Sequence, residues 1–435
     1  MLWRRWLGLV FIVGIASILP SATVGQPAVL QLVFRVPDGS PIRSSPVIDV
    51  AKNTIYFGAD DGNLYAIPLP TREQPRPSPK WIFEPRDPDD LSKPLDPRRR
   101  RPIRVPPVID EARNRIYIAN DNGYLYAVDR DTGQPASDPE FRPEPRKAPI
   151  RVPPALDQVL GRLYVGADDR QIAALNSENG SRVTVFTQPK GAIRAAPVID
   201  FVSNAVYFGA DDGKFYGIDR ENITAAATGF KEVSIGNPVR GSPVIDIGGA
   251  GVEAAIYFGA DNGFFYAIDR AGKELYRFET GGPVRTMAAV DPFKRAVYVV
   301  SDDGNLYALY RNDERDAKGE VVRRAGTRKF SFSLIADGNP NPLDGDLPRS
   351  SPVVDRRLGN TGTGTVIVGS VDGNLYGIDP DTGRLRFVHS VPEAGRSPRA
   401  AIRTTPALYV SGPGAIIEIY IGADDGGLYF VSRRP

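Results

Sequence analysis

Eight arginines recur at equivalent positions along the chain, and they carry its clearest potential for chemistry. They are Arg43, Arg104, Arg151, Arg194, Arg240, Arg285, Arg349 and Arg403. Each opens a segment rich in apolar residues, and subtraction gives intervals of 61, 47, 43, 46, 45, 64 and 54 residues between them. Guanidinium groups gathered at one place attract carboxylates and phosphates. The series therefore predicts a positive collar that could bind an anion or an acidic peptide.

Acidic turns follow these arginines and could neutralise them. The aspartates that begin the turns are Asp60, Asp121, Asp168, Asp211, Asp261, Asp302 and Asp424. Antiparallel strands, about 4.8 Å apart, would return the turns to the rim where the arginines lie. Two interpretations stay open. The favoured one is a ring of salt bridges that mostly neutralises itself, with about 0–1 kcal/mol from each exposed pair. The other is a genuine site for an anion or an acidic partner.

Three other groups of residues are weaker candidates for chemistry. Residues 129–131 and 379–381 alternate carboxylates as a calcium loop does, but no acidic residue closes either loop, which favours ordinary turns. His389 is the single histidine, so a His-rich metal cluster is excluded and no triad is indicated. Residues 98–101 are four consecutive arginines, which favour a solvated loop over contact with an anionic membrane or partner.

The arginines stand at the head of a repeat that indicates three β-strands. In the fourth copy these strands are residues 193–200, 206–209 and 215–218, which are rich in β-branched and aromatic residues and bounded by Asp and Gly turn signals. Two positions nine residues apart, Tyr207 and Tyr216 in this copy, are tyrosine in most copies, so the hairpin between them has constant length. A less regular outer strand follows.

A strand-rich repeat with a period near 45 residues predicts one propeller blade per copy. We therefore expect an all-β fold, an eight-bladed β-propeller with four-stranded antiparallel blades in a single domain over residues 28–435. The last copy ends soon after its third strand, at 428–430, while an unassigned strand at 30–35 precedes the first copy. This N-terminal strand is predicted to be the outer strand of the last blade and to close the ring.

Composition limits the classes of function that the chain could have. Hydrophobic residues make up 41% and charged residues 24% of the 435 residues, as in a soluble globular protein. A net charge of +2 argues against bulk nucleic-acid binding. The absence of cysteine excludes disulfides, thiolate metal sites, cysteine nucleophiles and lipid attachment through cysteine. Arg4 and Arg5 precede an apolar run at 6–19, which predicts a secretory signal within residues 1–25, either cleaved or retained as an anchor.

The repeat resembles the blade of the pyrroloquinoline-quinone (PQQ) type propeller family over nearly all of residues 30–435. The matching residues are Ser45-Pro46-Val47-Ile48, the hairpin Tyr56-Phe57-Gly58-Ala59-Asp60-Asp61-Gly62-Asn63-Leu64-Tyr65-Ala66-Ile67 and the tail Val128-Asp129-Arg130-Asp131-Thr132-Gly133. The resemblance implies one of two functions, a quinoprotein dehydrogenase or a non-catalytic scaffold similar to BamB.

Such dehydrogenases hold the quinone between a tryptophan and a vicinal disulfide, over calcium. This chain has no cysteine, Trp3 and Trp6 lie in the expected signal, and Trp81 lies in an expected outer strand. The lipidated cysteine of a BamB-like lipoprotein is also missing.

These observations predict an exported, non-catalytic β-propeller that acts as a protein-interaction scaffold. We expect a protein or acidic peptide as partner, bound by the eight arginines, with no nucleic acid, no cofactor and no metal. The protein is expected to be a monomer in the periplasm or outside the cell, with a possible peripheral or anchored association with the envelope. The alternatives are a PQQ- and calcium-dependent dehydrogenase, and a sensor or anionic-glycan-binding propeller.

Overall fold

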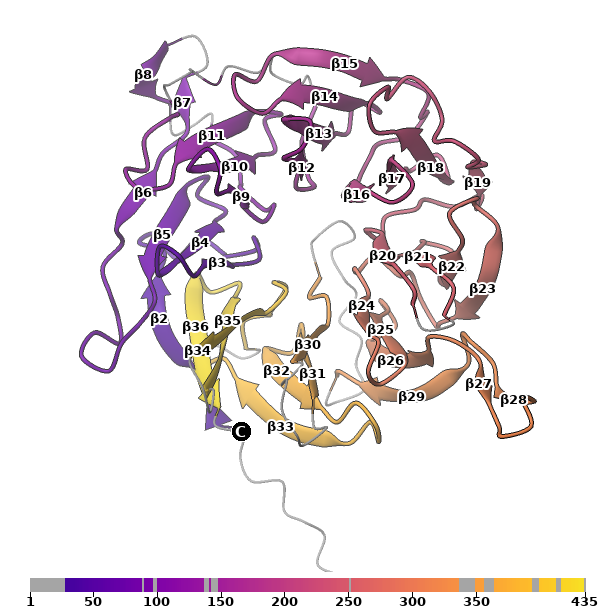
Figure 1. Ribbon diagram of the computed structural model, residues 1–435. Helices are drawn as coiled ribbons and strands as arrows, with labels where there is room; N and C mark the ends of the chain where they lie inside the picture. The colour runs from indigo at the N-terminus through magenta and orange to yellow at the C-terminus, as the bar shows by residue number, and fades with distance from the viewer. Residues whose placement is uncertain are drawn as a thin grey trace, which may run out of the picture.

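Eight antiparallel sheets form a ring in the computed structural model, which describes residues 28–87, 90–96, 100–136, 141, 148–249, 252–335, 349–355, 364–392, 399–411 and 416–433. Figure 1 shows the sheets arranged around a common axis, with the chain passing from one sheet to the next in sequence order. The described residues contain strands and turns but no α-helix. The predicted eight-bladed β-propeller is therefore confirmed. The predicted signal in residues 1–25 lies outside the described residues.

The first four blades take the following strands. Blade 1 consists of β3 (Val47–Asp49), β4 (Thr54–Gly58), β5 (Leu64–Pro68) and β6 (Trp81–Phe83). Blade 2 consists of β9 (Val108–Asp110), β10 (Arg115–Ala119) and β11 (Leu125–Asp129). Blade 3 consists of β12 (Ala155–Asp157), β13 (Arg162–Gly166), β14 (Ile172–Asn176) and β15 (Arg182–Phe186). Blade 4 consists of β16 (Val198–Asp200), β17 (Ala205–Gly209), β18 (Lys214–Asp219) and β19 (Val233–Ser234).

The last four blades complete the ring. Blade 5 consists of β20 (Val244–Asp246), β21 (Ala255–Gly259), β22 (Phe264–Ile268) and β23 (Glu274–Glu279). Blade 6 consists of β24 (Ala289–Asp291), β25 (Ala296–Val300), β26 (Asn305–Tyr310) and β29 (Arg328–Ser333). Blade 7 consists of β30 (Val353–Asp355), β31 (Thr365–Gly369), β32 (Asn374–Ile378) and β33 (Leu385–Ser390). Blade 8 consists of β34 (Ala407–Ser411), β35 (Ile416–Gly422), β36 (Gly427–Arg433) and β2 (Gln31–Arg35).

The N-terminal strand closes the ring as predicted. β2 pairs antiparallel with β36, with Gln31 opposite Phe430 and Leu32 opposite Tyr429. One feature was not predicted: the two-residue strand β1 (Ala28–Val29) pairs parallel with β33 of blade 7. The N-terminal segment therefore contacts the outer edges of two successive blades, and Figure 1 shows it beside the C-terminal strand.

Blade 2 differs from the expected four strands. Within the described residues its sheet has three strands, and an isolated bridge between Val128 and Pro135 stands beside the outer one. Two of the long connections contain short hairpins. These are β7 (Arg86–Asp87) with β8 (Asp90–Pro94), and β27 (Glu314–Arg315) with β28 (Val321–Arg323).

The hydrophobic core lies between the blades rather than at one centre. One cluster, for example, joins Val33 and Leu428 of blade 8 to Phe57 and Tyr65 of blade 1. The second strands are buried along their whole length in most blades, as β4 and β17 show. Each blade thus covers one face of the next, so that both faces of a central strand are apolar.

Candidate functional site

Seven of the eight arginines, all except Arg349, whose preceding residues lie outside the described ranges, are held between the turns of two successive blades by backbone hydrogen bonds. At Arg104, the N–H of Ile103 donates to the carbonyl of Ala59 in blade 1 at 3.1 Å, and the carbonyl of Pro102 accepts from Asp121 in blade 2 at 3.3 Å. The same two bonds recur at Arg194, with lengths of 3.1 and 2.8 Å. The arginine is therefore fixed at the junction of two blades.

A glycine in the preceding blade allows this close approach. The residue before the arginine packs on the glycine that ends the second strand, and a Cβ added at Gly58 would lie 2.2 Å from Ile103. A Cβ at Gly259 would lie 2.2 Å from the carbonyl oxygen of Val284, which precedes Arg285. The Gly in the repeated Tyr-Phe-Gly sequence thus sets how near the arginine comes to the neighbouring turn.

The guanidinium groups bridge the carboxylates of neighbouring blades. Arg240 contacts Asp211 of blade 4 through Nε at 2.8 Å and Asp261 of blade 5 through Nη1 at 3.1 Å. Arg285 likewise contacts Asp261 through Nε at 2.8 Å and Asp302 through Nη1 at 3.3 Å. The ion pairs expected from the sequence are therefore present, and most arginines have two partners rather than one.

The pairs join into a nearly complete ring, which we call the arginine collar. It comprises Arg43, Arg104, Arg151, Arg194, Arg240, Arg285, Arg349 and Arg403 with Asp60, Asp121, Asp168, Asp211, Asp261, Asp302 and Asp424. Eight arginines and seven aspartates leave a formal charge of 8 − 7 = +1 within the collar.

The second position of the turn, which is aspartate in most blades, forms a different set of hydrogen bonds. Asp61 accepts the hydroxyl of Tyr65 at 2.6 Å and the backbone N–H of Asn63 at 2.9 Å. Asp372 accepts the hydroxyl of Tyr376 at 2.5 Å in the same way. Of the two carboxylates in the repeated Asp-Asp-Gly turn, the first therefore faces the collar and the second holds the hairpin.

Blade 7 interrupts the collar. Its turn is Ser370-Val371-Asp372-Gly373, so that Val371 stands where seven other blades place the collar aspartate. Among the described residues, Arg349 has one carboxylate partner, Asp302 of the preceding blade, at 2.5 Å from its Nε. Within the same ranges, Arg403 has one carboxylate partner, Asp424 of its own blade, at 2.9 Å. These two arginines flank the missing carboxylate.

The two flanking arginines are also the most buried of the collar. Their side chains are 8% and 9% exposed, against 17–34% for the other six. Nη1 of Arg403 is buried and has no hydrogen-bond partner among the described residues. Burial lowers the pKa of Arg349, and the charges of Arg285 and Arg403 lower it further, against the attraction of Asp302. This part of the collar therefore has an excess of buried positive charge.

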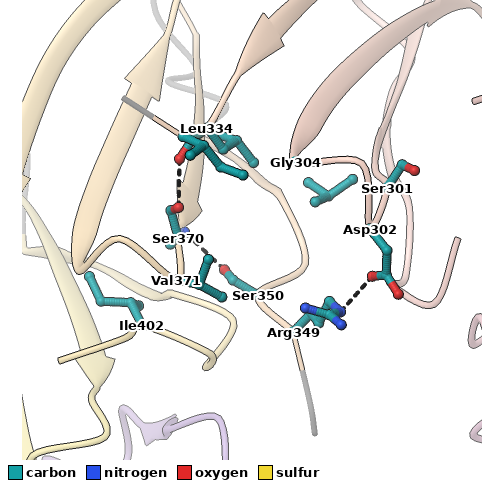
Figure 2. A pocket seen from close by; sticks show the side chains of 12 residues that line it. Ser301, Asp302, Gly304, Leu334, Arg349, Ser350, Ser370, Val371 and Ile402 are labelled. Atoms are coloured by element: carbon teal, nitrogen blue, oxygen red, sulfur yellow. Dashed lines mark hydrogen bonds and ion pairs between the residues drawn. The ribbon is translucent and has the colours of Figure 1, made fainter. Parts of the chain in front are cut away.

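A pocket opens beside the interruption, between blades 6 and 7. It has a volume of about 40 Å³ and is lined on its apolar side by Val300, Leu334, Ile335 and Ile402. Figure 2 shows Arg349 directed toward Asp302 on one side of the pocket, with Val371 and Ile402 across from it. Ser370 donates to the carbonyl of Leu334 at 2.6 Å, so its hydroxyl is already engaged.

A second series of arginines, which was not predicted from the sequence, forms ion pairs between successive blades at the opposite rim. Each member follows a third strand and pairs with the aspartate that ends the first strand of the preceding blade. The pairs are Arg130–Asp49, Arg220–Asp157, Arg270–Asp200 and Arg311–Asp246. The recurrence of Arg directly after the third strand was the signal that could have revealed them.

The opposite rim also exposes apolar side chains in the turns between first and second strands. They are Val50, Val159, Phe201, Val202, Ile247 and Phe293, and each is more than half exposed. The opposite rim thus combines Arg–Asp ion pairs between blades with exposed apolar side chains in its turns.

The remaining sequence candidates take ordinary structural positions. Asp129 accepts the backbone N–H groups of Asp131 and Thr132 at 3.0 and 2.8 Å, as an Asx turn does. Of the four consecutive arginines, Arg98 and Arg99 lie outside the described residues. Arg100 is not solvated as expected, because it pairs with Glu84 at 2.6 Å and donates to Asn63.

The described residues do not fit a PQQ and calcium site of the dehydrogenase kind. Trp81, the tryptophan of the propeller, lies in outer strand β6 and stacks on Tyr56 at 5.6 Å, away from the axis. There is no cysteine for a vicinal disulfide. Within the described ranges, no three His, Asp or Glu side chains converge as metal ligands would.

Comparison with known proteins places this fold among propellers. Residues 105–320 match the family model described as outer membrane protein assembly factor BamB. This region carries the BamB-type repeat. The resemblance to PQQ-type propellers, stated above from the motifs, is confirmed. No curated protein sequence matches the chain significantly.

Three solved structures share the fold at low sequence identity. BamB from Moraxella catarrhalis is 16% identical, with a TM-score of 0.60 over 93% of this chain and 100% of that one. Sqt1 from Saccharomyces cerevisiae is 10% identical, with a TM-score of 0.62 over 94% of this chain and 100% of that one. The computationally designed protein Ika8 is 15% identical, with a TM-score of 0.59 over 93% of this chain and 100% of that one.

No helix in the described part of the chain has the length and hydrophobicity needed to cross a bilayer.

Proposed function

We propose that this protein is an exported, non-catalytic β-propeller that binds an acidic segment of another protein at its arginine collar. The observation that carries the proposal is the collar itself, which gathers eight guanidinium groups at one rim and leaves them one carboxylate short. Partly paired arginines can bind carboxylates while the fold stays intact. The match to a family described as an assembly factor supports a role in binding proteins, and its outer-membrane description supports export.

The test is chemical cross-linking in cells that produce the protein, followed by mass spectrometry of the captured partner. The variant to compare is Arg194→Gln, Arg240→Gln and Arg285→Gln together. We expect it to lose most of the captured partner, because charge complementarity at the rim steers and holds an acidic segment.

A control variant removes the same charge from the outer strands. Arg182, Arg277 and Arg328 lie exposed on β15, β23 and β29, and their replacement by glutamine should leave capture unchanged. Equal capture by both variants and the wild type would overturn the proposal and leave the collar as a purely structural ring.

The rival function, a quinone-dependent dehydrogenase, is tested separately. PQQ and calcium added to the purified protein should give neither a stoichiometric quinone spectrum nor dye reduction. Either signal would replace the scaffold proposal with the catalytic one. An anionic-glycan-binding propeller would instead retain acidic glycans on an affinity array.

A further inference from the structure

At Val371 the collar lacks the aspartate that the other blades have. We call this place between Arg349 and Arg403 the vacancy, and the other blades show which chemical group would bind in it. At the equivalent place in the ring, Asp211 binds Nε of Arg240 through Oδ1 at 2.8 Å, and its Oδ2 lies 3.7 Å from Nε of Arg194. Asp261 bridges Arg240 and Arg285 in the same way. The repeat thus shows what lies between two successive arginines, a carboxylate that binds the following arginine through both oxygens and also approaches the preceding arginine through Oδ2. Between Arg349 and Arg403 the equivalent turn position is occupied by Val371.

Because the arginines beside the vacancy are buried, the missing carboxylate destabilises the unbound protein. A buried charge is tolerated when it is paired and hydrogen-bonded, and it is destabilising otherwise. Arg349 and Arg403 are both more than nine-tenths buried, yet each has a single carboxylate partner in the described structure. Nη1 of Arg403 has no hydrogen-bond partner there. An incoming carboxylate would meet guanidinium groups that are already desolvated and held in place.

The pocket beside Val371 indicates which kind of side chain would bind next to the carboxylate. Its walls are the apolar side chains Val300, Leu334, Ile335 and Ile402, and Arg349 lies at its edge (Figure 2). Its volume of about 40 Å³ suits a small side chain, since about 10–15 Å³ by this measure holds one water. Apolar walls favour an alkyl group over the hydroxyls of a sugar.

We propose that a partner polypeptide completes the collar at blade 7. An Asp or Glu of the partner places its carboxylate between Arg349 and Arg403, and a small apolar side chain next to it enters the pocket between blades 6 and 7. This inference rests on the proposed function and deepens it, because it names one position in the ring and one class of sequence.

The test uses the full-length protein with arginine side chains labelled with ¹⁵N, and follows the Nε–H signals of Arg349 and Arg403. The probe is the acetylated and amidated tetrapeptide Gly-Val-Asp-Gly, and the matched probe is Gly-Val-Asn-Gly. We expect the aspartate peptide to shift both signals with a dissociation constant at least tenfold below that of the asparagine peptide. A third probe, acetyl-Gly-Gly-Val with a free carboxylate, distinguishes a chain end from a side chain as the source of the charge.

Two variants of the vacancy complete the experiment. Val371→Asp supplies the missing carboxylate from the chain itself and should abolish binding of the aspartate peptide. Val371→Thr keeps the shape without the charge and should retain binding within about twofold, which also controls for misfolding. Unchanged binding by Val371→Asp, or equal binding of the two tetrapeptides, would overturn the inference, as would a clear preference for inorganic phosphate or an acidic glycan.

Failure here is distinguishable from failure of the proposed function. If the peptide does not bind at blade 7 but the Arg194, Arg240 and Arg285 variant still loses its cross-linked partner, only the position is wrong. If neither experiment gives a difference, the collar does not bind proteins.

Discussion

A guanidinium that contacts carboxylates of neighbouring blades recurs throughout this molecule. The contribution of each such ion pair to the free energy of folding depends on how deeply the pair is buried. In the collar the side chains are partly exposed, so each pair contributes little to the free energy of folding. At the opposite rim the ion pair between Arg311 and Asp246 is buried, with side chains 5% and 4% exposed. Removing one partner of such a pair leaves an uncompensated buried charge. The buried pairs of the opposite rim therefore hold successive blades together, whereas binding is the role that we propose for the collar.

Asp246→Ala should destabilise the protein by about 3–5 kcal/mol, because Arg311 remains buried without its carboxylate. The control is Asp131→Ala, which removes an exposed partner of Lys52 and should cost under about 1 kcal/mol. Unfolding in urea at pH 7 measures both. Similar losses for the two variants would refute the distinction between the rims.

Asp379 gives the fold a defined dependence on pH. Burial opposes its ionisation, but Arg386 at 2.6 Å and the backbone N–H groups of Thr382 and Asp381 outweigh burial, so the pKa of Asp379 is lowered. A carboxyl with a lowered folded pKa contributes stability above its unfolded pKa, about 3.9, and that stability is lost as the pH falls below this value.

Asp379→Asn should therefore lose less stability than the wild type between about pH 4 and pH 2. The measurement is the free energy of unfolding across this window, with the Asp131→Ala variant as reference. Parallel curves for the wild type and Asp379→Asn would show that the contacts of Asp379 do not stabilise its charged form.

At the scale of the element, the blade is defined by a rigid hairpin and a variable outer strand. The turn between β17 and β18 is held by Asp212, which accepts from Tyr216 at 2.8 Å. The outer strands differ more from blade to blade, since β19 has two residues and β29 has six. This explains why the sequence predicted the inner three strands of each blade well. It also explains why it missed the three-stranded sheet of blade 2.

The ring closure was predictable because the chain had one strand too many at its start and one too few at its end. The parallel pairing of β1 with β33 was not, since two residues carry no periodic signal. Closure places Val33 and Val36 in the cluster between blades 8 and 1, and Leu30 in the cluster between blades 7 and 8. The N-terminal segment therefore contributes to two junctions.

Deletion of residues 28–38 should lower the melting temperature of the whole ring, because it exposes the edge of β36 and removes Leu30, Val33 and Val36 from the core. The control shortens the hairpin of β27 and β28, where Val321, Val322 and Arg323 are all exposed. That change should leave the melting temperature nearly unaltered. An unchanged transition after the deletion would disprove closure by this segment.

At the scale of the whole molecule, the collar is an eightfold pattern with one defect. The spacing of the arginines and aspartates was enough to predict that they meet at one rim. The spacing could not show that Val371 leaves two arginines with one carboxylate fewer. Only the geometry shows that each collar aspartate contacts arginines of two successive blades. The pocket beside Val371 depends on how blades 6 and 7 pack, and no local pattern encodes it.

Filling the defect should stabilise the ring. Val371→Asp is expected to raise the free energy of unfolding by about 1–2 kcal/mol, since hydrogen bonds to charged groups contribute about 1.5–3 kcal/mol and some desolvation offsets them. The gain should largely persist in 0.5 M salt, because Arg349 and Arg403 are nearly buried and salt screens buried pairs much less than exposed ones. Thermal unfolding of Val371→Asp against Val371→Thr measures it, and a lower midpoint for the aspartate variant would contradict the expected geometry.

Photo-cross-linking from position 371 tests most directly whether the interrupted collar is the binding surface. A benzophenone amino acid at Val371 is compared with one at Ile247, which is exposed at the opposite rim. The account predicts a partner cross-link from position 371 that the Gly-Val-Asp-Gly peptide suppresses and the asparagine peptide does not. A cross-link from position 247 alone, or one from 371 that neither peptide affects, would contradict it.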